Sequence, residues 1–372
     1  MKLLTQISRA FVGILFIISG LIKANDTIGF SYKLIEYFEI FDFTIFIPYA
    51  VPLAMVICIF EIISGVALLI GIYARLNAWL LLLLIIFFTL LTGYSAITNK
   101  VTDCGCFGDA IKLTPVQSFE KDLVLLVLIV IIFLGTKHIK PLFNKAIVHI
   151  GLFVAFLVST FFTIYTYMFL PVKDFLPYKI GNNIYDLTLI PENAEKDVIE
   201  MVFIYEKGGQ QFEFDMNHLP AEQDSFVYVD RKDKLIKKGY HPPIHDFKIF
   251  DSLGVEHTEQ FFAEKGYKLV LVQTKLDEGR KGIEPALNET IQYFISQQKG
   301  KFWALTSSSG DDIKSYTNQH QINFSYYNMD AIPLKSMVRS NPGLMLLKDN
   351  VVVKKWSCYN IPNPQVLNKY MK

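Results

Sequence analysis

The chain has 372 residues, of which 52% are apolar and 19% charged, whereas an ordinary soluble protein carries about a quarter charged residues. The first 170 residues hold only 11 of the 36 lysines and arginines and 9 of the 35 aspartates and glutamates, so a charge-poor half precedes a half with a soluble composition. This division excludes a single globular domain, the net charge of +1 excludes a basic nucleic-acid binder, and four cysteines are too few for a disulfide-stapled scaffold.

Five apolar runs in the first half are long enough, or nearly so, to cross about 30 Å of hydrocarbon as helices of about 20 residues. The first run follows Lys2 and Arg9 and reads alternatively as the core of a signal peptide. Lys23 follows it directly and no small-residue cleavage site does, so we expect a retained helix. The five runs are Ala10–Ala24, Ile45–Tyr73, Ala78–Ile97, Leu123–Gly135 with its flanks, and Ile147–Leu170.

The charged residues on the short loops indicate an orientation. The segments on the N-terminal side of the membrane contain no acidic residue, whereas the opposite loops carry both signs. We therefore expect a multi-pass protein of a bacterial inner membrane with its N-terminus in the cytoplasm. Five spans then place the C-terminal half in the periplasm, on the same side as the loop after the third span. The basic residues on the N-terminal side are Lys2, Arg9, Arg75, Lys137, Lys140 and Lys145.

Glu61 lies in the middle of the second span, where a carboxylate is costly unless it is paired or neutral, so it should face the bundle interior. Two interpretations remain open. Glu61 either handles protons or pairs with Lys23 or Arg9, or it is protonated and locks the helices together through hydrogen bonds. Ser64 and Gly65, one turn further on, are suited to close helix packing.

The loop after the third span contains two cysteines one residue apart, in the run Asp103-Cys104-Gly105-Cys106-Phe107-Gly108-Asp109. As a redox pair, Cys104 and Cys106 would exchange with a partner's disulfide, and their own disulfide would close a small, strained and therefore oxidising ring. Gly105 relieves part of that strain because it has no Cβ. The pair could instead be two unreacted thiols in a packed loop. A tetrahedral zinc site needs two further ligands, so we predict no metal.

These motifs resemble a known family. The run Arg9-Ala-Phe-Val-Gly-Ile-Leu-Phe-Ile-Ile-Ser-Gly20-Leu-Ile-Lys23 resembles the opening helix of DoxX membrane proteins, and Glu61-Ile-Ile-Ser-Gly65 with the cysteine loop resembles the related MauE branch. The resemblance covers about the first 140 residues and implies a four-helix core with a role in thiol–disulfide chemistry outside the cytoplasm. It implies that Cys104 and Cys106 are the redox pair, supported by Glu61, Asp103, Gly105, Phe107 and Gly108. It also makes a quinone a candidate cofactor.

Residues 171–240 are predicted to be a β-rich connector. Two strand-like runs flank Gly208-Gly209, which is a hairpin signal. A second hairpin is predicted from Ser225–Val229 and Lys234–Lys237, with its turn at Asp230–Asp233. We predict no catalytic or binding residues in this segment.

Residues 241–372 alternate strands and helices and close with a hairpin and a helix, which is a thioredoxin-like order. The buried-type strand Tyr267–Val272 leads the series, and Asn341-Pro342 precedes the strand Gly343–Leu347. Pro342 resembles the cis-proline of that fold. A thioredoxin-fold oxidoreductase carries Cys-x-x-Cys after the first of these strands, but this chain has Gln273-Thr-Lys-Leu-Asp-Glu-Gly-Arg280 there. We therefore predict a docking domain rather than a second catalyst.

The predicted fold is a membrane all-α bundle followed by a soluble α/β thioredoxin-like domain. Its parts are the four-helix DoxX/MauE-like domain (1–145), a fifth span (146–170), the connector (171–240) and the thioredoxin-like domain (241–372). The predicted function is thiol–disulfide exchange with exported protein thiols or a periplasmic redox partner, as an oxidoreductase or a subunit of one. The alternative is a non-catalytic membrane scaffold. The lipid bilayer is a predicted partner and nucleic acid is not.

Overall fold

The computed structural model describes residues 1–371 apart from 99, 102–104, 222–224 and 299. These residues form two compact units. One unit combines residues 1–182 with 248–372, and the other is residues 183–247. The first unit contains both the apolar helices and the C-terminal α/β domain.

Every predicted span falls on a helix. The described helices of this region are α1 (Lys2–Asn25), α2 (Thr27–Ile40), the 3-10 helix η1 (Thr44–Tyr49), α3 (Ala50–Ile70), α4 (Ala74–Thr98), α5 (Pro115–Leu134), the 3-10 helix η2 (Thr136–His138) and α6 (Lys145–Phe169). Among the described residues, four helical stretches are long and apolar enough to cross a membrane: α1, η1 with α3, α4 and α6.

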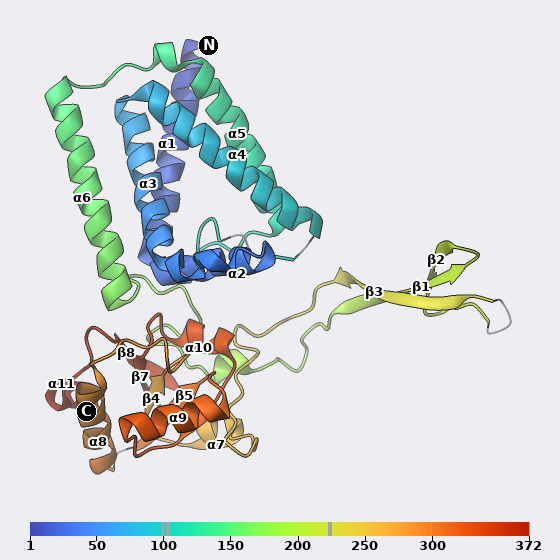
Figure 1. Ribbon diagram of the computed structural model, residues 1–372, viewed down its shortest axis with the longest axis vertical. Coiled ribbons are helices and arrows are strands. Elements are labelled where there is room, and N and C mark those ends of the chain that lie inside the picture. Colours follow the sequence, from blue (N-terminus) through green and yellow to red (C-terminus); the bar gives the residue numbers. More distant parts are fainter. Residues whose placement is uncertain (99, 102–104, 222–224, 299, 372) are drawn as a thin grey trace. The chain divides into compact units, whose positions relative to one another are not determined.

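The predicted fourth span is a helix, α5, but it differs in composition from the other four. It has 20 residues, and Glu120, Lys121 and Asp122 all lie in its first two turns. Helix α5 is therefore not one of the four long apolar stretches among the described residues, and its crossing of the membrane stays a prediction. The charged start of α5 packs alongside α4, as Figure 1 shows, and takes part in the site described below.

Helices α1 and α3 approach each other closely through glycines, as predicted for Gly65. A Cβ atom on Gly65 would lie 2.6 Å from the carbonyl oxygen of Gly13, and one on Gly20 would lie 2.7 Å from Ile62 Cγ1. Any larger side chain would push the helices apart, because such distances are shorter than van der Waals contact. Small residues are the usual means of close helix approach in membranes. This contact brings Glu61 of α3 against α1.

Helix α2 was not predicted from the sequence. Asp26 caps its N-terminus by accepting a 2.8 Å hydrogen bond from the Gly29 amide. The helix occupies 14 residues between the first two spans. Charged and aromatic residues are mixed in this stretch, so its apolar residues show no clear helical periodicity. It lies beside the cysteine loop, since a Cβ on Gly105 would lie 2.9 Å from Lys33 Cγ of α2.

The unit of residues 183–247 is built on a three-stranded antiparallel sheet. Its strands are β1 (Val198–Lys207), β2 (Gln210–Asp215) and β3 (Val227–Lys237), in the order β2-β1-β3. The hairpin at Gly208-Gly209 is confirmed, and both glycines have positive φ. The second predicted hairpin is wrong, because Asp230–Asp233 continues one long strand. Its polar side chains are paired there, Arg231 with Asp233 and Lys232 with Glu213.

The C-terminal α/β domain has the predicted order of elements. They are α7 (Thr258–Ala263), β4 (Tyr267–Val272), α8 (Glu284–Ser296), β5 (Gly300–Thr306), α9 (Gly310–His320), β6 (Tyr326–Asn328), α10 (Ala331–Met337), β7 (Gly343–Lys348), β8 (Val351–Ser357) and α11 (Pro364–Tyr370). The sheet order is β6-β5-β4-β7-β8, with β4, β5 and β6 parallel and β7 and β8 antiparallel. The short helix α7 was not predicted.

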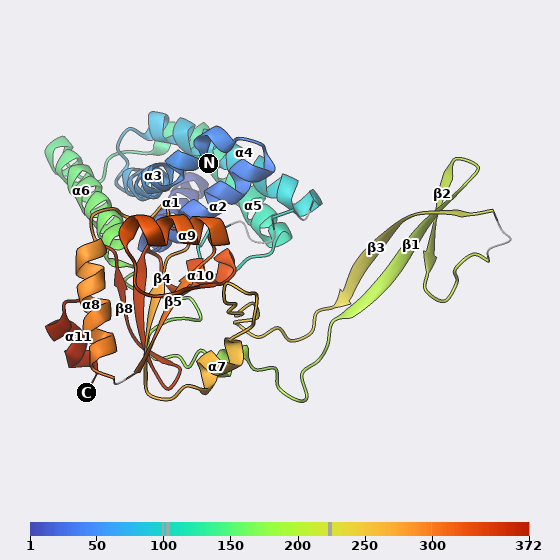
Figure 2. The same ribbon diagram turned by 60° about the horizontal axis from the view of Figure 1, so that its bottom comes forward.

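Strand β4 forms the centre of this sheet, and all six of its residues are buried. Leu269 and Leu271 belong to one core cluster with Ile291 of α8 and Leu367 of α11. Figure 2 shows α8 and α11 side by side. The Asn341–Pro342 peptide bond is cis and lies immediately before β7, as predicted.

Lys268 is fully buried in β4. Its ammonium donates to the carbonyl oxygens of Phe261 at 2.7 Å and Glu264 at 3.0 Å, and to the side chain of Asn350. Burial lowers the pKa of Lys268 to about 8. The lysine thus ties the end of α7 to the β7–β8 turn while its charge is held out of water.

Replacing Gly20 with valine should destabilise the helical bundle. The new side chain would meet Ile62 at 2.7 Å and the Cys58 carbonyl at 3.0 Å, and overpacking of this kind costs about 1–3 kcal/mol. We expect a lower thermal midpoint for the purified protein in detergent. Gly151→Val in α6 is the matched control, because nothing lies within 4 Å of a Cβ there. Equal midpoints for the two variants would contradict the close approach of α1 and α3.

The stability of the α/β domain should rise with pH above about 8, where Lys268 loses its proton in the folded protein. In the unfolded chain the lysine pKa is about 10.4, so between these values the unfolded state holds more protons and folding gains with each step in pH. We expect the thermal midpoint, followed by tryptophan fluorescence in detergent, to rise with pH relative to Lys268→Gln. Parallel pH profiles for the two proteins would refute this.

Candidate functional site

The cysteine loop turns at two glycines that precede and follow Cys106. Gly105 and Gly108 have φ of +66° and +50°, and the Gly108 amide donates to the Gly105 carbonyl at 3.0 Å. A left-handed conformation at both positions is what glycine allows without strain. Asp103 and Cys104 of the predicted site lie outside the described residues. The structure therefore describes one cysteine of the pair, Cys106, which is partly exposed.

Cys106 is attached to α1 through its backbone. The Ser19 hydroxyl lies 3.0 Å from the Cys106 carbonyl oxygen and 3.2 Å from the Glu61 carboxylate. A hydroxyl has one proton to donate, so it serves one of these two acceptors at a time. Ser19 thus connects the cysteine loop to the buried carboxylate of the second predicted span.

Glu61 forms a buried ion pair with Lys23, which is one of the two partners predicted for it. The two side chains are only 3% and 4% exposed. The ammonium also lies over the rings of Phe30 and Phe88, at 5.2 and 5.8 Å from their centroids. Cations are attracted to aromatic faces at these distances. The other suggested partner, Arg9, instead donates to the carbonyl oxygens at positions 68 and 69.

A second ion pair, Lys121 with Asp122, lies at the start of α5. Asp122 is 2% exposed and also accepts a 3.0 Å hydrogen bond from Thr92 of α4. The Lys121 ammonium is 5.8 Å from the ring centroid of Phe107, the residue after Cys106. Lys121 and Cys106 also line the same cavity. Phe107, a predicted supporting residue, therefore positions this charge beside the cysteine.

The two ion pairs and the cysteine loop surround one small cavity of about 40 Å³. Residues from α1, α2, α3, α4 and α5 contribute to its wall. This volume has room for water, which needs about 10–15 Å³ per molecule and two to four polar partners. It is far below the roughly 300–1,000 Å³ of pockets that hold small organic ligands. The polar groups in the wall belong to Ser19, Lys23, Glu61, Cys106, Lys121 and Asp122.

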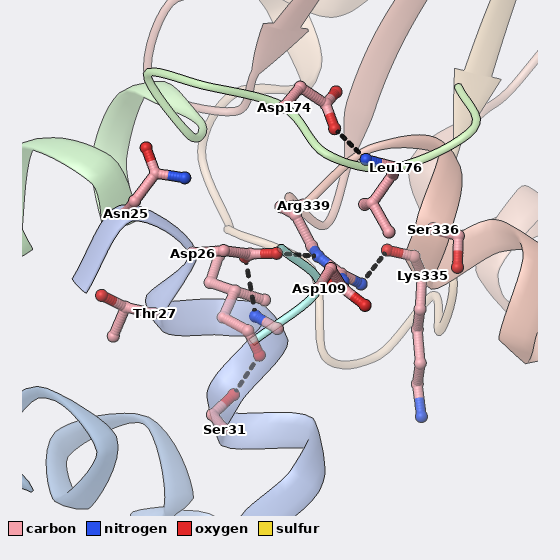
Figure 3. A network of polar contacts seen from close by, with 12 residues as sticks. Asn25, Asp26, Thr27, Ser31, Asp109, Asp174, Leu176, Lys335, Ser336 and Arg339 are labelled. Atoms are coloured by element: carbon pink, nitrogen blue, oxygen red, sulfur yellow. Dashed lines mark hydrogen bonds and ion pairs between the residues drawn. The ribbon is translucent and has the colours of Figure 1, made fainter. Parts of the chain in front are cut away.

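The same loop is held from the C-terminal domain by Arg339. The guanidinium binds Asp109 of the loop at 2.6 Å and Asp26 of the α2 cap at 2.8 Å, as Figure 3 shows. It also donates to the Lys335 carbonyl at 2.6 Å. Burial lowers the pKa of Arg339, but the attraction of Asp26 and Asp109 outweighs it and the net shift is upward. Arg339 is thus a permanently charged link between the cysteine loop and the α/β domain.

Arg339 lies three residues before the cis-proline, and the segment that replaces Cys-x-x-Cys contacts that proline's neighbours. The Arg280 amide donates to the Asn341 carbonyl at 3.1 Å, and the Asn341 side chain donates to the Lys275 carbonyl at 2.7 Å. Cys358 is buried nearby, its amide bonded to Ser340 Oγ at 2.9 Å. Pro342 therefore helps to shape a closed loop cluster that contains no exposed thiol among the described residues.

The structure thus brings together Glu61, Cys106, Phe107 and Gly108 of the predicted site, whereas Pro342 lies in the α/β domain. Sequence reasoning missed Ser19, Lys121, Asp122, Asp109 and Arg339 as members of the site. Ser19 had a usable signal, because it lies four residues before Lys23 and shares its face of α1. Lys121 and Asp122 also had a sequence signal, because they are charged residues near the start of an otherwise apolar helix. Arg339 had no such signal, since its partners are distant in the sequence.

These features define a multi-pass membrane protein whose helical bundle holds a cysteine-containing loop and which continues into a thioredoxin-like α/β domain. Residues 1–135 match the protein family described as methylamine utilisation protein MauE, so the helical part of the chain is MauE-like. Residues 199–238 match a domain of unknown function (DUF8463).

One curated protein is similar to part of the chain. Protein TlpB of Flavobacterium psychrophilum is 28% identical over 195 residues, which is 48% of this chain and 49% of that protein. The chain therefore spans about half the length of this relative. No solved structure matches the chain.

Replacing Arg339 with glutamine should destabilise the contact between the loop and the α/β domain. Removing one partner of a buried ion pair costs about 3–5 kcal/mol, because the remaining charges lose their compensation. Thermal unfolding in detergent, followed by tryptophan fluorescence, should show a clearly lower midpoint. Arg231→Gln is the matched control, because Arg231 pairs with Asp233 at the surface, where such pairs contribute less than about 1 kcal/mol. Equal losses would rule out a structural role for the Arg339 link.

Proposed function

We propose that this protein carries out thiol–disulfide exchange at Cys104 and Cys106. A thiolate of the pair attacks one sulfur of a partner's disulfide, forms a mixed disulfide and releases a partner thiolate. The second cysteine then attacks the mixed disulfide. The products are the Cys104–Cys106 disulfide and a partner with two thiols, so two electrons and two protons have moved to the partner. The reverse sequence uses the same groups.

One observation carries the proposal: the loop that contains Cys106 is held over buried charges. Ser19 binds the Cys106 carbonyl, and the Lys121 ammonium lies beside the cysteine. Reactive cysteines are partly exposed and lie near cations, which stabilise the thiolate, whereas structural cysteines are buried and inert. Cys106 has the first environment, and Cys58 and Cys358 have the second.

The α/β domain is proposed to dock the partner rather than to react with it. Its segment 273–280 has no cysteine, and Cys358 is 8% exposed. Arg339 holds this domain to the cysteine loop through Asp109. A partner bound to the domain would therefore be presented to Cys104 and Cys106. The proposed partners are exported protein thiols or another periplasmic redox protein.

The proposal includes a location. The protein would lie in a bacterial inner membrane with its N-terminus in the cytoplasm, and with the cysteine loop and the α/β domain in the periplasm. This arrangement requires α5 to cross the membrane as a fifth span, in addition to the four long apolar stretches. The contact between Arg339 and Asp109 supports placing the loop and the domain on one side. A quinone, if one accepts the electrons, would need a site other than the cavity under the loop, which is too small for it.

A second candidate function is a non-catalytic scaffold. The specific observation in its favour is the edge of the α/β domain at the cis-proline, where the chain's own Arg280 and Lys275 are bonded to Asn341. A domain whose loops are bonded to one another in this way can serve as a fixed connector. In that case both loop cysteines would be dispensable.

Trapping of the thiols in intact cells separates these functions. Cells are quenched in acid and labelled with a membrane-impermeant maleimide that shifts a gel band, before and after reduction. We expect labelling of the pair without permeabilisation and mainly after reduction. At least one of the variants Cys104→Ser and Cys106→Ser, the one that keeps the attacking thiol, should accumulate a reductant-sensitive adduct with a partner, because the resolving thiol is missing. Cys358→Ser is the control and should behave as the unchanged protein.

Two permanently reduced thiols that never form an adduct would exclude exchange and favour the scaffold. Labelling that requires permeabilised cells would place the loop in the cytoplasm and overturn the proposed orientation. The two outcomes are independent, because the first concerns the redox state of the pair and the second concerns its side of the membrane.

A further inference from the structure

We infer that Cys106 is the thiol that this site holds ready to ionise, with Lys121 as the charge partner of its thiolate and Glu61 as the acceptor of its proton. This inference deepens the proposed exchange reaction and rests on it. It assigns different roles to the two cysteines and gives a function to charges that are buried within a membrane-spanning bundle.

The charges in the cavity wall balance before and after ionisation of Cys106. With Cys106 as a thiol, the cavity wall holds two cations, Lys23 and Lys121, and two anions, Glu61 and Asp122, so its formal charge is zero. Loss of the thiol proton to water would leave a net negative charge in a poorly solvated site, which is costly. Transfer of that proton to a carboxylate of the same cavity leaves the total at zero. The site can therefore create a thiolate without creating net charge.

The acceptor is Glu61 rather than Asp122. Glu61 and Asp122 each bind one lysine and one hydroxyl, so what distinguishes them is their connection to Cys106. The hydroxyl partner of Asp122 is Thr92 of α4, which does not contact the cysteine loop in any described bond. Glu61 is connected to the cysteine loop, because Ser19 lies within hydrogen-bond distance of both the carboxylate and the Cys106 carbonyl. The cavity of about 40 Å³ reaches both Cys106 and Glu61 and has room for water to carry the proton.

Contacts on two sides fix the position of Lys121 near Cys106. Its ammonium is fixed from one side by Asp122 and from the other by the ring of Phe107, so it stays beside Cys106 instead of moving into solvent. A thiolate at Cys106 would be attracted to this ammonium, because both groups line the same cavity. Once Glu61 is protonated, Lys23 has lost its carboxylate partner, while Lys121 keeps Asp122. Both lysines then favour the thiolate.

The charged groups that face Cys106 come from α1, α3 and α5. They are Lys23 of α1, Glu61 of α3, and Lys121 and Asp122 of α5, while α4 contributes the uncharged Thr92. Lys33 of α2 lies at the neighbouring Gly105, outside the cavity wall, and is paired with Glu36. The proposed step is an internal proton transfer: the S–H bond of Cys106 breaks and an O–H bond forms on Glu61. No electrons leave the site in this step. The thiolate then attacks a partner's disulfide, as proposed above.

The test measures the ionisation of one thiol in full-length protein. A Cys104→Ser background, reduced and in detergent, removes coupling between the two cysteines. The rate of alkylation of Cys106 by iodoacetamide is followed from pH 5.5 to 10 by mass spectrometry of its peptide, with pH values chosen to bracket an ordinary thiol pKa of about 8.5. A proton shared between Cys106 and Glu61 gives a coupled titration. We expect a rate that rises with pH in two steps separated by a level region, because the shared proton leaves only in the second step.

Three variants are compared in that background. Lys121→Met should lower the rate at pH 7 by about tenfold, which corresponds to one pKa unit, and leave the rate at pH 10 within a factor of about two. Lys121→Arg should retain the original rate. Lys112→Met, which removes a lysine from the exposed part of the same loop, is the matched control and should change nothing.

Glu61→Gln should abolish the level region and leave a single sigmoidal titration. If that variant does not fold because Lys23 loses its partner, the double variant Lys23→Gln with Glu61→Gln removes both charges and should also titrate in a single step. A level region that survives the loss of Glu61 would overturn its role as proton acceptor. Equal profiles for Lys121→Met and Lys112→Met would overturn the role of Lys121.

The titration needs no partner, so it fails independently of the exchange reaction. A coupled titration in a protein that forms no adducts in cells would support the acid–base assignment and refute the proposed function. Adduct formation with an ordinary single-step titration would do the opposite.

Discussion

The rest of the structure depends on one constraint: a lysine and a glutamate are buried within apolar helices and must meet. Lys23 and Glu61 are nearly inaccessible to solvent, and neither could remain charged there alone. They meet because Gly13, Gly20 and Gly65 allow α1 and α3 to touch. Once these helices are in contact, Ser19 is aligned with Glu61 on one side and with the cysteine loop on the other. The packing of the helices therefore determines the position of Cys106.

A second set of contacts, made from outside the helical bundle, also fixes the position of the cysteine loop. Asp26 and Asp109 both bind Arg339, so the cap of α2 and the end of the loop share one cation. Gly29 makes room for it, because a Cβ there would lie 2.9 Å from the guanidinium. The segment that follows Arg339 contains the cis-proline. Arg339 therefore connects the loop segment before the cis-proline directly to the cysteine loop.

The sequence predicts helices, strands and local motifs better than it predicts contacts between residues that are distant in the chain. Strand β4 and the cis-proline were recognisable because an uninterrupted apolar run and an Asn-Pro-Gly motif are local signals. Lys23 could be proposed for Glu61 because a charge within a span needs a partner. The link from Asp109 to Arg339 joins residues 230 positions apart and has no local signal. The error at Asp230–Asp233 has the same origin: four charged residues look like a turn until the neighbouring strands that pair with them are known.

The presence of two ion pairs under the loop, rather than one, has a chemical consequence. A single Lys–Glu pair could accept a proton, but the freed lysine alone would then have to stabilise the thiolate from within α1. The second pair supplies a cation at the cysteine itself, and Asp122 keeps that cation compensated in the resting state. Before ionisation each lysine therefore has a carboxylate partner. After the proton transfer the cavity holds two lysine cations and one carboxylate, and the remaining positive charge balances the thiolate. A site arranged in this way changes from neutral thiol to thiolate by moving one proton over a short distance, which suits a reaction that must proceed in either direction at the edge of a membrane.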